Sequence, residues 1–497
     1  MDLEQLTGLK VYPNSVVEHD DTTCFLARSD AGKRLGILGD AACFEGTRQG
    51  DVLLCPLTAE NAAALRDRLP WLRPQPLGLC KSVGFGDRLG LATPGHVRAV
   101  RKFDLAPLFA QQSIRENART GRTPRQVLDE AMWGLFQEGW REPWGADADH
   151  LKTTADITSC VAAGYTLYTI DPGDHVDNAA HTAPPAELEA KVCALPWDAL
   201  KDTLQDMERR YLGRSFDLGE FALTFDRESL WRAAAKYGRA IAHTARMYRR
   251  LVETSPPPPH PPSPSPNGRG GGGCRGEGVR FELEVSVDET ETPTSPLEHL
   301  FIASELRRLG VRWVSLAPRF VGRFEKGVDY IGDLAEFEAE FVRHAAIARA
   351  LGPYKLSLHS GSDKFSLYPI IARHAGDLAH VKTAGTSYLE ALRSLAAVDP
   401  TLFRQILTFA RLRYNEDKAT YHVSADPEKV PPPEALSNGE LAGVLDTFDG
   451  RQVLHVTFGS VLDRFGERLK ATLAEHEEAY YEALEAHFVK HLEPFKW

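Results

Sequence analysis

Short apolar runs alternate along the chain with longer segments of helical periodicity. The runs are rich in β-branched and aromatic residues, and several of them end in polar side chains. Between them, segments such as SPLEHLFIASELRRLG and EFEAEFVRHAAIARALG place apolar residues every three or four positions, as an amphipathic helix does. The eight predicted strands lie within residues 82–96, 103–113, 145–153, 164–175, 279–290, 311–320, 354–365 and 378–387.

Eight strands that each lead into a helix favour an α/β fold with a parallel (β/α)₈ barrel of the TIM type. An open, doubly wound sheet is the alternative, because it has the same alternation. We expect the barrel to occupy residues 81–395. Residues 1–80 mix β and helical patterns and predict an N-terminal α+β extension, whereas residues 396–497 predict a mainly helical region that packs on the barrel.

One segment, residues 255–278, differs from the rest in composition. It reads SPPPPHPPSPSPNGRGGGGCRGEG, a run of prolines followed by a run of glycines. Such a composition cannot pack a hydrophobic core. Because the alternation of strands and helices resumes after it, we interpret the segment as a disordered insertion within the barrel.

Composition and charge exclude several classes of function. The 497 residues are 43% hydrophobic and 26% charged, as in globular proteins, and the net charge of −11 argues against nucleic acid or an anionic membrane as partner. We find neither a signal-peptide pattern nor an apolar run of about 18 residues. The 7 cysteines are scattered without CxxC spacing, which predicts reduced thiols and a cytoplasmic protein.

Polar and titratable side chains gather where the predicted strands end. In a parallel barrel the active site lies at the C-terminal ends of the strands, where the loops converge. We therefore predict a polar pocket at that end of the barrel. Its candidate residues are Asp87, Gln111, Asp149, His150, Lys152, Asp288, Glu289, Arg319, His359, Ser360, Asp363, His380 and Lys382.

Three of these candidates, His150, His359 and His380, are histidines at the ends of three different strands. A single histidine at such a position is more often a hydrogen-bonded structural residue. Three of them with carboxylates on the same rim indicate a divalent-metal site, and this ligand set suits Zn²⁺, Mn²⁺, Fe²⁺, Co²⁺ or Ni²⁺. Because successive strand residues face opposite ways, Asp149 and His150 can share the pocket only if the strand ends near them.

Five longer motifs resemble the tagaturonate epimerase family: GFGDRLGLATPGH, GADADHLKT, VSVDETETPTSP, LHSGSDKFSLYP and HVKTAGTSYLEALR. The resemblance covers the chain from about residue 80 to its C-terminal end. It implies a metal-dependent enzyme that interconverts D-tagaturonate and D-fructuronate or, as in some relatives, tagatose and fructose. The Asp-His pair and LHSGS are also similar, more distantly, to class II aldolases. A proline/glycine insertion is not expected of the family.

The substrates that the resemblance implies restrict the mechanism. The two hexuronates differ at C4, a carbinol carbon β to the ketone, whose hydrogen the carbonyl does not acidify. Inversion therefore requires transient oxidation by a nicotinamide, or retro-aldol cleavage, rotation of the aldehyde and re-addition. The stretch GFGDRLG lacks the full dinucleotide fingerprint, whereas a metal site is available. The sequence therefore favours the retro-aldol route, with the cation as Lewis acid.

The resemblance also implies roles for individual residues. Asp149 is the expected general base, by its position beside His150 and by the likeness to aldolases. Asp288 or Glu289 is expected to act on the opposite face of the substrate, and the sequence does not decide between them. The side chains expected to bind the substrate are Lys152, Arg319, Ser360, Asp363, Lys382, Asp87 and Gln111.

Two other functions fit the same pattern of residues. One is a class II type aldolase that releases its fragments, and the other is a barrel that only binds a sugar acid. In each case the expected partner is a small ketose or ketohexuronate, and a homo-oligomer is compatible with the sequence. If the C-terminal helices close over the pocket, then Tyr421, His422 or His455 joins the site.

Overall fold

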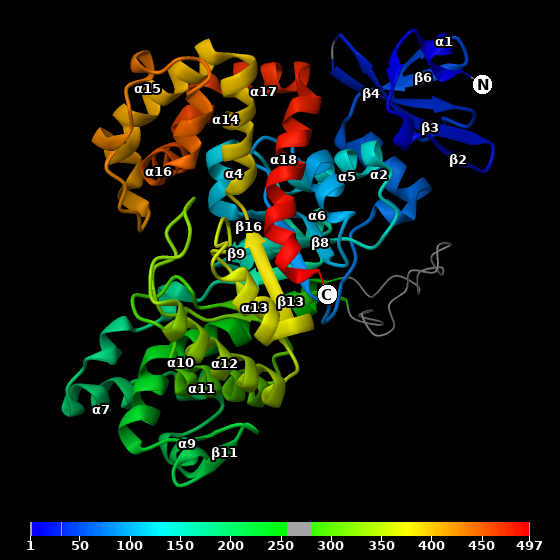
Figure 1. Cartoon of the computed structure of the whole chain (residues 1–497). Coiled ribbons are helices and arrows are strands. Elements are labelled where there is room, and N and C mark those ends of the chain that lie inside the picture. The colour runs from blue at the N-terminus through cyan, green and yellow to red at the C-terminus, as the bar shows by residue number, and fades with distance from the viewer. Residues whose placement is uncertain (1, 31, 256–279, 497) are drawn as a thin grey trace.

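A closed barrel of parallel strands lies at the centre of the molecule (Figure 1). The computed structural model describes residues 2–30, 32–255 and 280–496. Around the barrel the strands follow the order β7-β8-β9-β10-β13-β14-β15-β16, and β16 pairs with β7 to close the ring. The strands are β7 (Ser82–Phe85), β8 (Ala106–Ser113), β9 (Gly145–Leu151), β10 (Leu167–Ile170), β13 (Glu282–Ser286), β14 (Ser315–Ala317), β15 (Lys355–Leu358) and β16 (Ala379–Thr383).

The closed ring confirms the predicted fold class and excludes the open sheet. Each barrel strand lies inside one of the eight predicted runs. The predicted insertion, residues 255–278, lies outside the described residues from position 256 onward. The connection between β10 and β13 also carries the hairpin of β11 (Ser215–Asp217) and β12 (Ala222–Thr224), which the sequence pattern did not indicate.

Helices surround the barrel, and several of them begin with a side-chain cap directly after a strand. Ser113 ends β8 and caps α4 in a reciprocal capping box with Glu116. Thr153 does the same for α6, two residues after β9 ends. These helices are α3 (Thr93–Val100), α4 (Ile114–Thr120), α5 (Pro124–Glu138), α6 (Thr154–Ala163), α7 (Pro185–Cys193), α8 (Trp197–Leu200), α9 (Leu204–Tyr211), α10 (Arg227–Thr254), α11 (Pro296–Arg308), α12 (Leu334–Leu351), α13 (Tyr368–Ala375) and α14 (Thr386–Val398).

The chain before β7 forms an antiparallel sheet of order β1-β3-β4-β6-β5, with β2 paired to β3. This sheet lies against the C-terminal region, where Glu477 accepts hydrogen bonds from Tyr12 and Arg28 and pairs with Lys33. Its elements are α1 (Leu3–Thr7), β1 (Lys10–Val11), β2 (Val17–His19), β3 (Thr22–Ser29), β4 (Gly32–Leu38), β5 (Thr47–Gln49), β6 (Val52–Cys55) and α2 (Ala59–Arg68).

The C-terminal region is helical and lies over the C-terminal ends of the barrel strands (Figure 1). Its last helix packs against both α3 and α14. None of the helices in the described part of the chain combines the length and the hydropathy needed to cross a membrane. The helices are α15 (Pro400–Asp417), α16 (Phe448–Val456), α17 (Phe458–Glu475) and α18 (Glu477–Leu492).

The apolar core lies between the barrel strands and their helices, whereas the barrel interior is charged. Asp147, Glu284 and Lys382 are each at most 1% exposed inside the ring. Charged groups are buried only when they are paired, and Lys382 is paired with both carboxylates. The barrel interior therefore contains ionised groups that can take part in binding or catalysis, in addition to packed side chains.

Free thiols are present among the described residues at Cys24, Cys43, Cys55, Cys160 and Cys193.

Candidate active site

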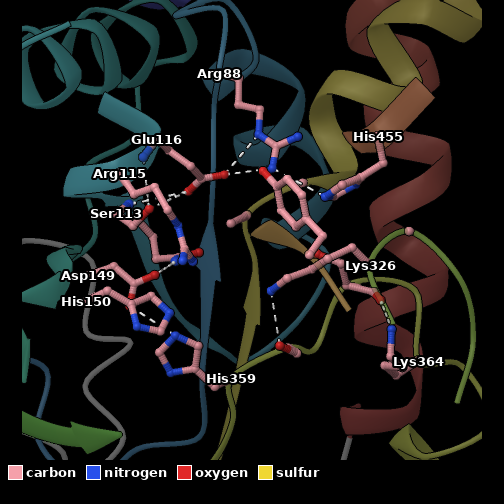
Figure 2. Close-up of a pocket in the computed structure, with 17 residues that line it drawn as sticks. Arg88, Ser113, Arg115, Glu116, Asp149, His150, Lys326, His359, Lys364 and His455 are labelled. Carbon is pink, nitrogen blue, oxygen red and sulfur yellow. Dashed lines mark hydrogen bonds and ion pairs between the residues drawn. The ribbon is translucent and has the colours of Figure 1, made fainter. Parts of the chain in front are cut away.

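A cavity opens at the C-terminal ends of the barrel strands, where the sequence predicted a polar pocket (Figure 2). Asp149, His150 and His359 lie on one side of it, at the ends of β9 and β15. Tyr421 and His455 line it from the C-terminal region. The helices after the barrel therefore contribute side chains to the site.

Asp149 and His150 both face the cavity because β9 is irregular at this point. Its register with β10 shifts between the pairs Tyr168–Ala148 and Ile170–Leu151, so that β9 holds one residue more than its partner. His150 has a φ of 51°, in the left-handed region, which non-glycine residues seldom adopt. In a regular strand the side chain of His150 would point away from the cavity if that of Asp149 faced it. The bulge turns His150 toward the cavity as well.

Three side chains come close enough to hold one ion. Ligand atoms of Asp149, His150 and His359 all lie within 4.8 Å of one another. The two imidazole rings have centroids 4.3 Å apart, and Nε2 of His359 lies 3.2 Å from Oδ1 of Asp149. The other ring nitrogen of the buried His359, Nδ1, lies 3.3 Å from Oε1 of Glu284. Imidazole nitrogens and neighbouring carboxylates are the donors that Zn²⁺ and related cations take.

A second group of ligand atoms shares His150. It consists of His150, Asp171 and Glu289, again within 4.8 Å of one another. Nδ1 of His150 hydrogen-bonds Asp171 at 3.2 Å, and its Nε2 lies 3.8 Å from Glu289. The hydrogen bond between Nδ1 and Asp171 fixes the orientation of the imidazole ring, so that Nε2 is the nitrogen available to bind an ion in the cavity.

The structure does not bring His380, the third predicted ligand, to this group. It is fully buried in β16, opposite Ser82 of β7, whose hydroxyl lies 2.9 Å from its Nδ1. Its Nε2 is 3.9 Å from Glu284, inside the barrel. Burial lowers the pKa of His380 to about 3, so the ring is neutral. The side chain lies deeper in the ring than Lys382, two residues further along the same strand.

Lys382 lies beneath the cavity, surrounded by carboxylates. Its ammonium is 2.7 Å from Asp147, 2.9 Å from Asp149 and 2.8 Å from Glu284, and it also donates to the hydroxyl of Thr169. Burial acts to lower its pKa, but the three acids raise it well above the ordinary value. One ammonium among three carboxylates leaves a net negative charge beside His359, which suits a divalent cation.

The carboxyl group of Asp149 is held in one orientation. Its Oδ1 accepts from Lys382, and its Oδ2 accepts from Gln111 at 2.8 Å. Burial acts to raise its pKa, but Lys382, His359 and His150 hold that pKa well below the ordinary value. Asp149 is therefore ionised at neutral pH.

The two carboxylates predicted to act opposite Asp149 differ in their surroundings. Asp288, which follows β13, accepts a hydrogen bond at 2.5 Å from Ser286, the last residue of that strand. Glu289 pairs with Arg115, one of the residues that line the cavity, at 3.0 Å. Burial acts to raise the pKa of Glu289, but His150 and Arg115 lower it to about 2.

The residues predicted to bind the substrate divide into two groups. Gln111 and Ser360 line the cavity, and Lys382 lies below it. The others do not line it, and each has partners in the surrounding loops. Asp87 accepts from three backbone N–H groups before α3, Lys152 pairs with Asp174, Arg319 donates to the carbonyl of Thr290, and Asp363 pairs with Arg451.

Several lining residues were not singled out in the sequence. They are Ser113, Arg115, Glu116, Lys326 and Lys364. Arg115 and Glu116 follow the capping serine at the end of β8, and a search of the residues after each strand would have found them. Lys364 follows Asp363 directly and lies within the motif LHSGSDKFSLYP. Lys326 lies in the loop after β14, and no local pattern marks it.

The comparisons with known proteins agree with the resemblance found in the sequence. A family model described as tagaturonate epimerase matches residues 12–258 and 274–495. The gap between the two matched ranges falls inside the predicted proline/glycine insertion, and the match extends further toward the N-terminus than residue 80.

A curated relative and two crystal structures match over nearly the whole chain. The chain is 44% identical to the tagaturonate/fructuronate epimerase of Thermotoga maritima over 98% of this chain and 97% of that one. It is similar to the crystal structures of the fructuronate-tagaturonate epimerase of Cohnella laeviribosi, native and with one glycerol. Each has a TM-score of 0.90 at 38% identity, over 99% of this chain and 98% of that one.

Proposed function

Because the chain belongs to the tagaturonate epimerase family, we propose that it interconverts D-tagaturonate and D-fructuronate by inverting C4. The observation that carries this proposal is the group Asp149, His150 and His359 at the mouth of a closed barrel. It occurs in a chain that is 44% identical, almost end to end, to an enzyme of that name.

The residues present fit a divalent cation. His150 and His359 would hold it through imidazole nitrogens, with the carboxylate of Asp149 beside them. Two observations support this assignment. Carboxylates lie 3.2 and 3.3 Å from the two ring nitrogens of His359, and three carboxylates surround the single ammonium of Lys382. When bound, such a cation supplies Lewis-acid stabilisation of the negative charge that develops on the ketone oxygen.

Asp149 is the residue that we assign to the C4 hydroxyl. Its ionised carboxylate accepts the hydroxyl proton, the O–H electron pair forms the C4 carbonyl, and the C3–C4 bond breaks. The electrons of that bond move onto the C2–C3 unit and the ketone oxygen. Lys382 and Gln111 hold Asp149 in place throughout, because each donates to one of its oxygens.

Inversion then requires the aldehyde to rotate about its C4–C5 bond and to be attacked on its other face. Bond formation from C3 returns the electron pair, the new C4 alkoxide takes a proton from solvent, and Asp149 gives its own proton back to solvent. We assign Glu289 rather than Asp288 to this face of the substrate, where its ionised carboxylate accepts a hydrogen bond from the group that protonates C4–O. Glu289 lies 3.8 Å from His150 and pairs with Arg115, whereas Asp288 accepts a hydrogen bond from Ser286 at the end of β13.

A panel of substrates tests the proposed function. Purified protein is incubated with tagaturonate, fructuronate, tagatose and fructose in the presence of Ni²⁺, Mn²⁺ or Zn²⁺, and the products are read by NMR. We expect the C4 epimer of a hexuronate as the single product. Three-carbon products would establish the aldolase instead, and absence of turnover with every cation would favour a sugar-acid-binding barrel.

A further inference from the structure

One charged side chain of the cavity has no part in the chemistry above. Lys326 lies in the loop between β14 and α12, and its ammonium reaches into the middle of the cavity, between His455 and the group of Asp149 (Figure 2). Its Nζ donates to the hydroxyl of Ser360 at 3.1 Å. None of the ion pairs within the described ranges includes Lys326.

The other cations that line the cavity are already paired. Arg88 donates twice to Glu116, at 2.9 and 2.7 Å, and Arg115 pairs with Glu289. Lys364 is buried and donates to backbone carbonyl oxygens. An ammonium has three hydrogens, so Lys326 keeps two of them for a ligand in the cavity.

The backbone on either side of Lys326 is fixed by buried groups. The side chain of Glu325 accepts from Gln452 at 2.8 Å, and the carbonyl of Gly327 accepts from Arg451 at 2.5 Å. Lys364 also donates to the carbonyls of Glu325 and Val328. The backbone that carries Lys326 is therefore held in place before a ligand binds, and the hydrogen bond to Ser360 directs its ammonium into the cavity.

We propose that Lys326, together with the hydroxyl of Ser360, binds the C6 carboxylate of the hexuronate and so selects hexuronates over neutral ketohexoses. This inference rests on the proposed function. A carboxylate is the group that a hexuronate has and a ketohexose lacks, and an unpaired ammonium in a partly buried cavity recognises it by charge.

An anchor at C6 also suits the proposed cleavage. The two epimers share the configuration at C5 and the carboxylate at C6, so one site serves both of them. After the C3–C4 bond breaks, the carboxylate stays on the aldehyde fragment. Lys326 then retains that fragment while C4 rotates about the C4–C5 bond, which explains how an epimerase avoids releasing it.

Kinetics on a charged and a neutral substrate test the anchor. For Lys326→Met we expect kcat/KM for tagaturonate to fall roughly 10- to 150-fold, as for the loss of a hydrogen bond to a charged group. For tagatose, which has no carboxylate, we expect kcat/KM to change by less than about threefold. Lys326→Arg, which keeps the charge, should recover part of the loss. Equal losses on both substrates, or no loss, would overturn the inference.

Two further variants serve as comparisons. Ser360→Ala removes the hydroxyl partner of Lys326. It should lower kcat/KM less than Lys326→Met does, and again more for tagaturonate than for tagatose. Lys102→Met changes a lysine outside the cavity, paired with Glu485, and should leave both substrates unaffected. If Ser360→Ala affects tagatose as much as tagaturonate, the hydroxyl has no part in carboxylate binding.

Binding of unreactive analogues separates this inference from the proposed function. D-mannonate and D-mannitol, the reduced forms of fructuronate and fructose, differ only in the carboxylate. In calorimetric titrations we expect the wild type to prefer mannonate and Lys326→Met to lose that preference. Loss of the preference supports the anchor even if no epimerisation is found, whereas unchanged mannonate affinity in Lys326→Met overturns it.

Discussion

At the scale of single residues, the site depends on how β9 presents two neighbours. Asp149 and His150 face the same cavity because of the bulge and the left-handed backbone at His150. His359 lies at the end of a different strand, with its ring nitrogens 3.2 Å from Asp149 and 3.3 Å from Glu284. Each of these three side chains can be tested by a substitution that spares the others.

Substitution of the histidines tests the metal assignment. His359→Ala should lose the bound divalent cation and all turnover while the protein stays folded, because one imidazole ligand is removed. His380→Ala should keep its metal, because that ring lies deeper in the barrel, against Ser82. Metal content after dialysis, measured by mass spectrometry, checks both variants. If the His380→Ala protein contained no metal, His380 would be a metal ligand, as the sequence predicted.

Asp149→Asn tests the general base. The amide keeps the shape of the side chain but cannot accept the hydroxyl proton, so kcat should fall by about 10²- to 10⁴-fold. The metal content should stay close to that of the wild type. If the metal is lost with the activity, Asp149 acts as a ligand rather than as the base.

At the scale of elements, α18 connects the three parts of the molecule. At its first residue, Glu477 joins it to the N-terminal sheet. Near its end, His487 hydrogen-bonds Asp363 at 2.7 Å, in the loop after β15. Asp363 also pairs with Arg451 of α16. The helix thereby holds the loops that surround the cavity.

Two neighbouring glutamates allow a matched test of this connection. The side chain of Glu477 is 15% exposed and has four partners, of which Tyr12, Arg28 and Lys33 belong to the N-terminal region, whereas that of Glu478 is 63% exposed. Glu477→Gln should destabilise the protein by about 1–3 kcal/mol, and Glu478→Gln by less than about 0.5 kcal/mol. Urea unfolding of both variants measures the difference. Equal changes in the free energy of unfolding for the two variants would show that the contacts of Glu477 do not stabilise the packing of the N-terminal sheet on α18.

The barrel strands could be predicted because each one forms a short apolar run before a helix. Residues at strand ends, such as Asp149, His150 and His359, followed from that topology. The depth of His380 did not, because it depends on the register between β16 and β7. Lys326 was missed for a related reason: its loop reaches the cavity only through tertiary contacts with Arg451 and Gln452.

At the scale of the whole molecule, buried neutral histidines outside the cavity make stability dependent on pH. His96 hydrogen-bonds Ser387 at 2.7 Å, and His344 contacts His299 at 2.8 Å. Burial lowers the pKa of His96 and of His344 to about 4. The folded protein therefore binds protons less readily at these sites than the unfolded chain does.

Acid should destabilise the fold for this reason. Between pH 6.5 and about 4 the unfolded chain binds a proton at each site and the folded protein does not. The free energy of unfolding therefore decreases as the pH is lowered through this range. Each histidine should contribute a loss of about 2 kcal/mol between pH 7.5 and 5. Urea midpoints at both pH values measure this loss. His96→Gln should reduce the pH dependence, whereas the exposed His19→Gln should not, and an unchanged His96→Gln would contradict the explanation.

The most direct test of the retro-aldol epimerase is the fate of the C4 hydrogen. Metal-loaded protein is incubated with tagaturonate in D₂O, and the fructuronate formed is examined by ¹H NMR. Cleavage and re-addition leave the C4–H bond intact, so we expect fructuronate with protium at C4 and nearly the same kcat/KM for tagaturonate that carries deuterium at C4. Deuterium uptake at C4, a primary isotope effect of the kind that hydride transfer to a nicotinamide gives, or no fructuronate at all would contradict the account.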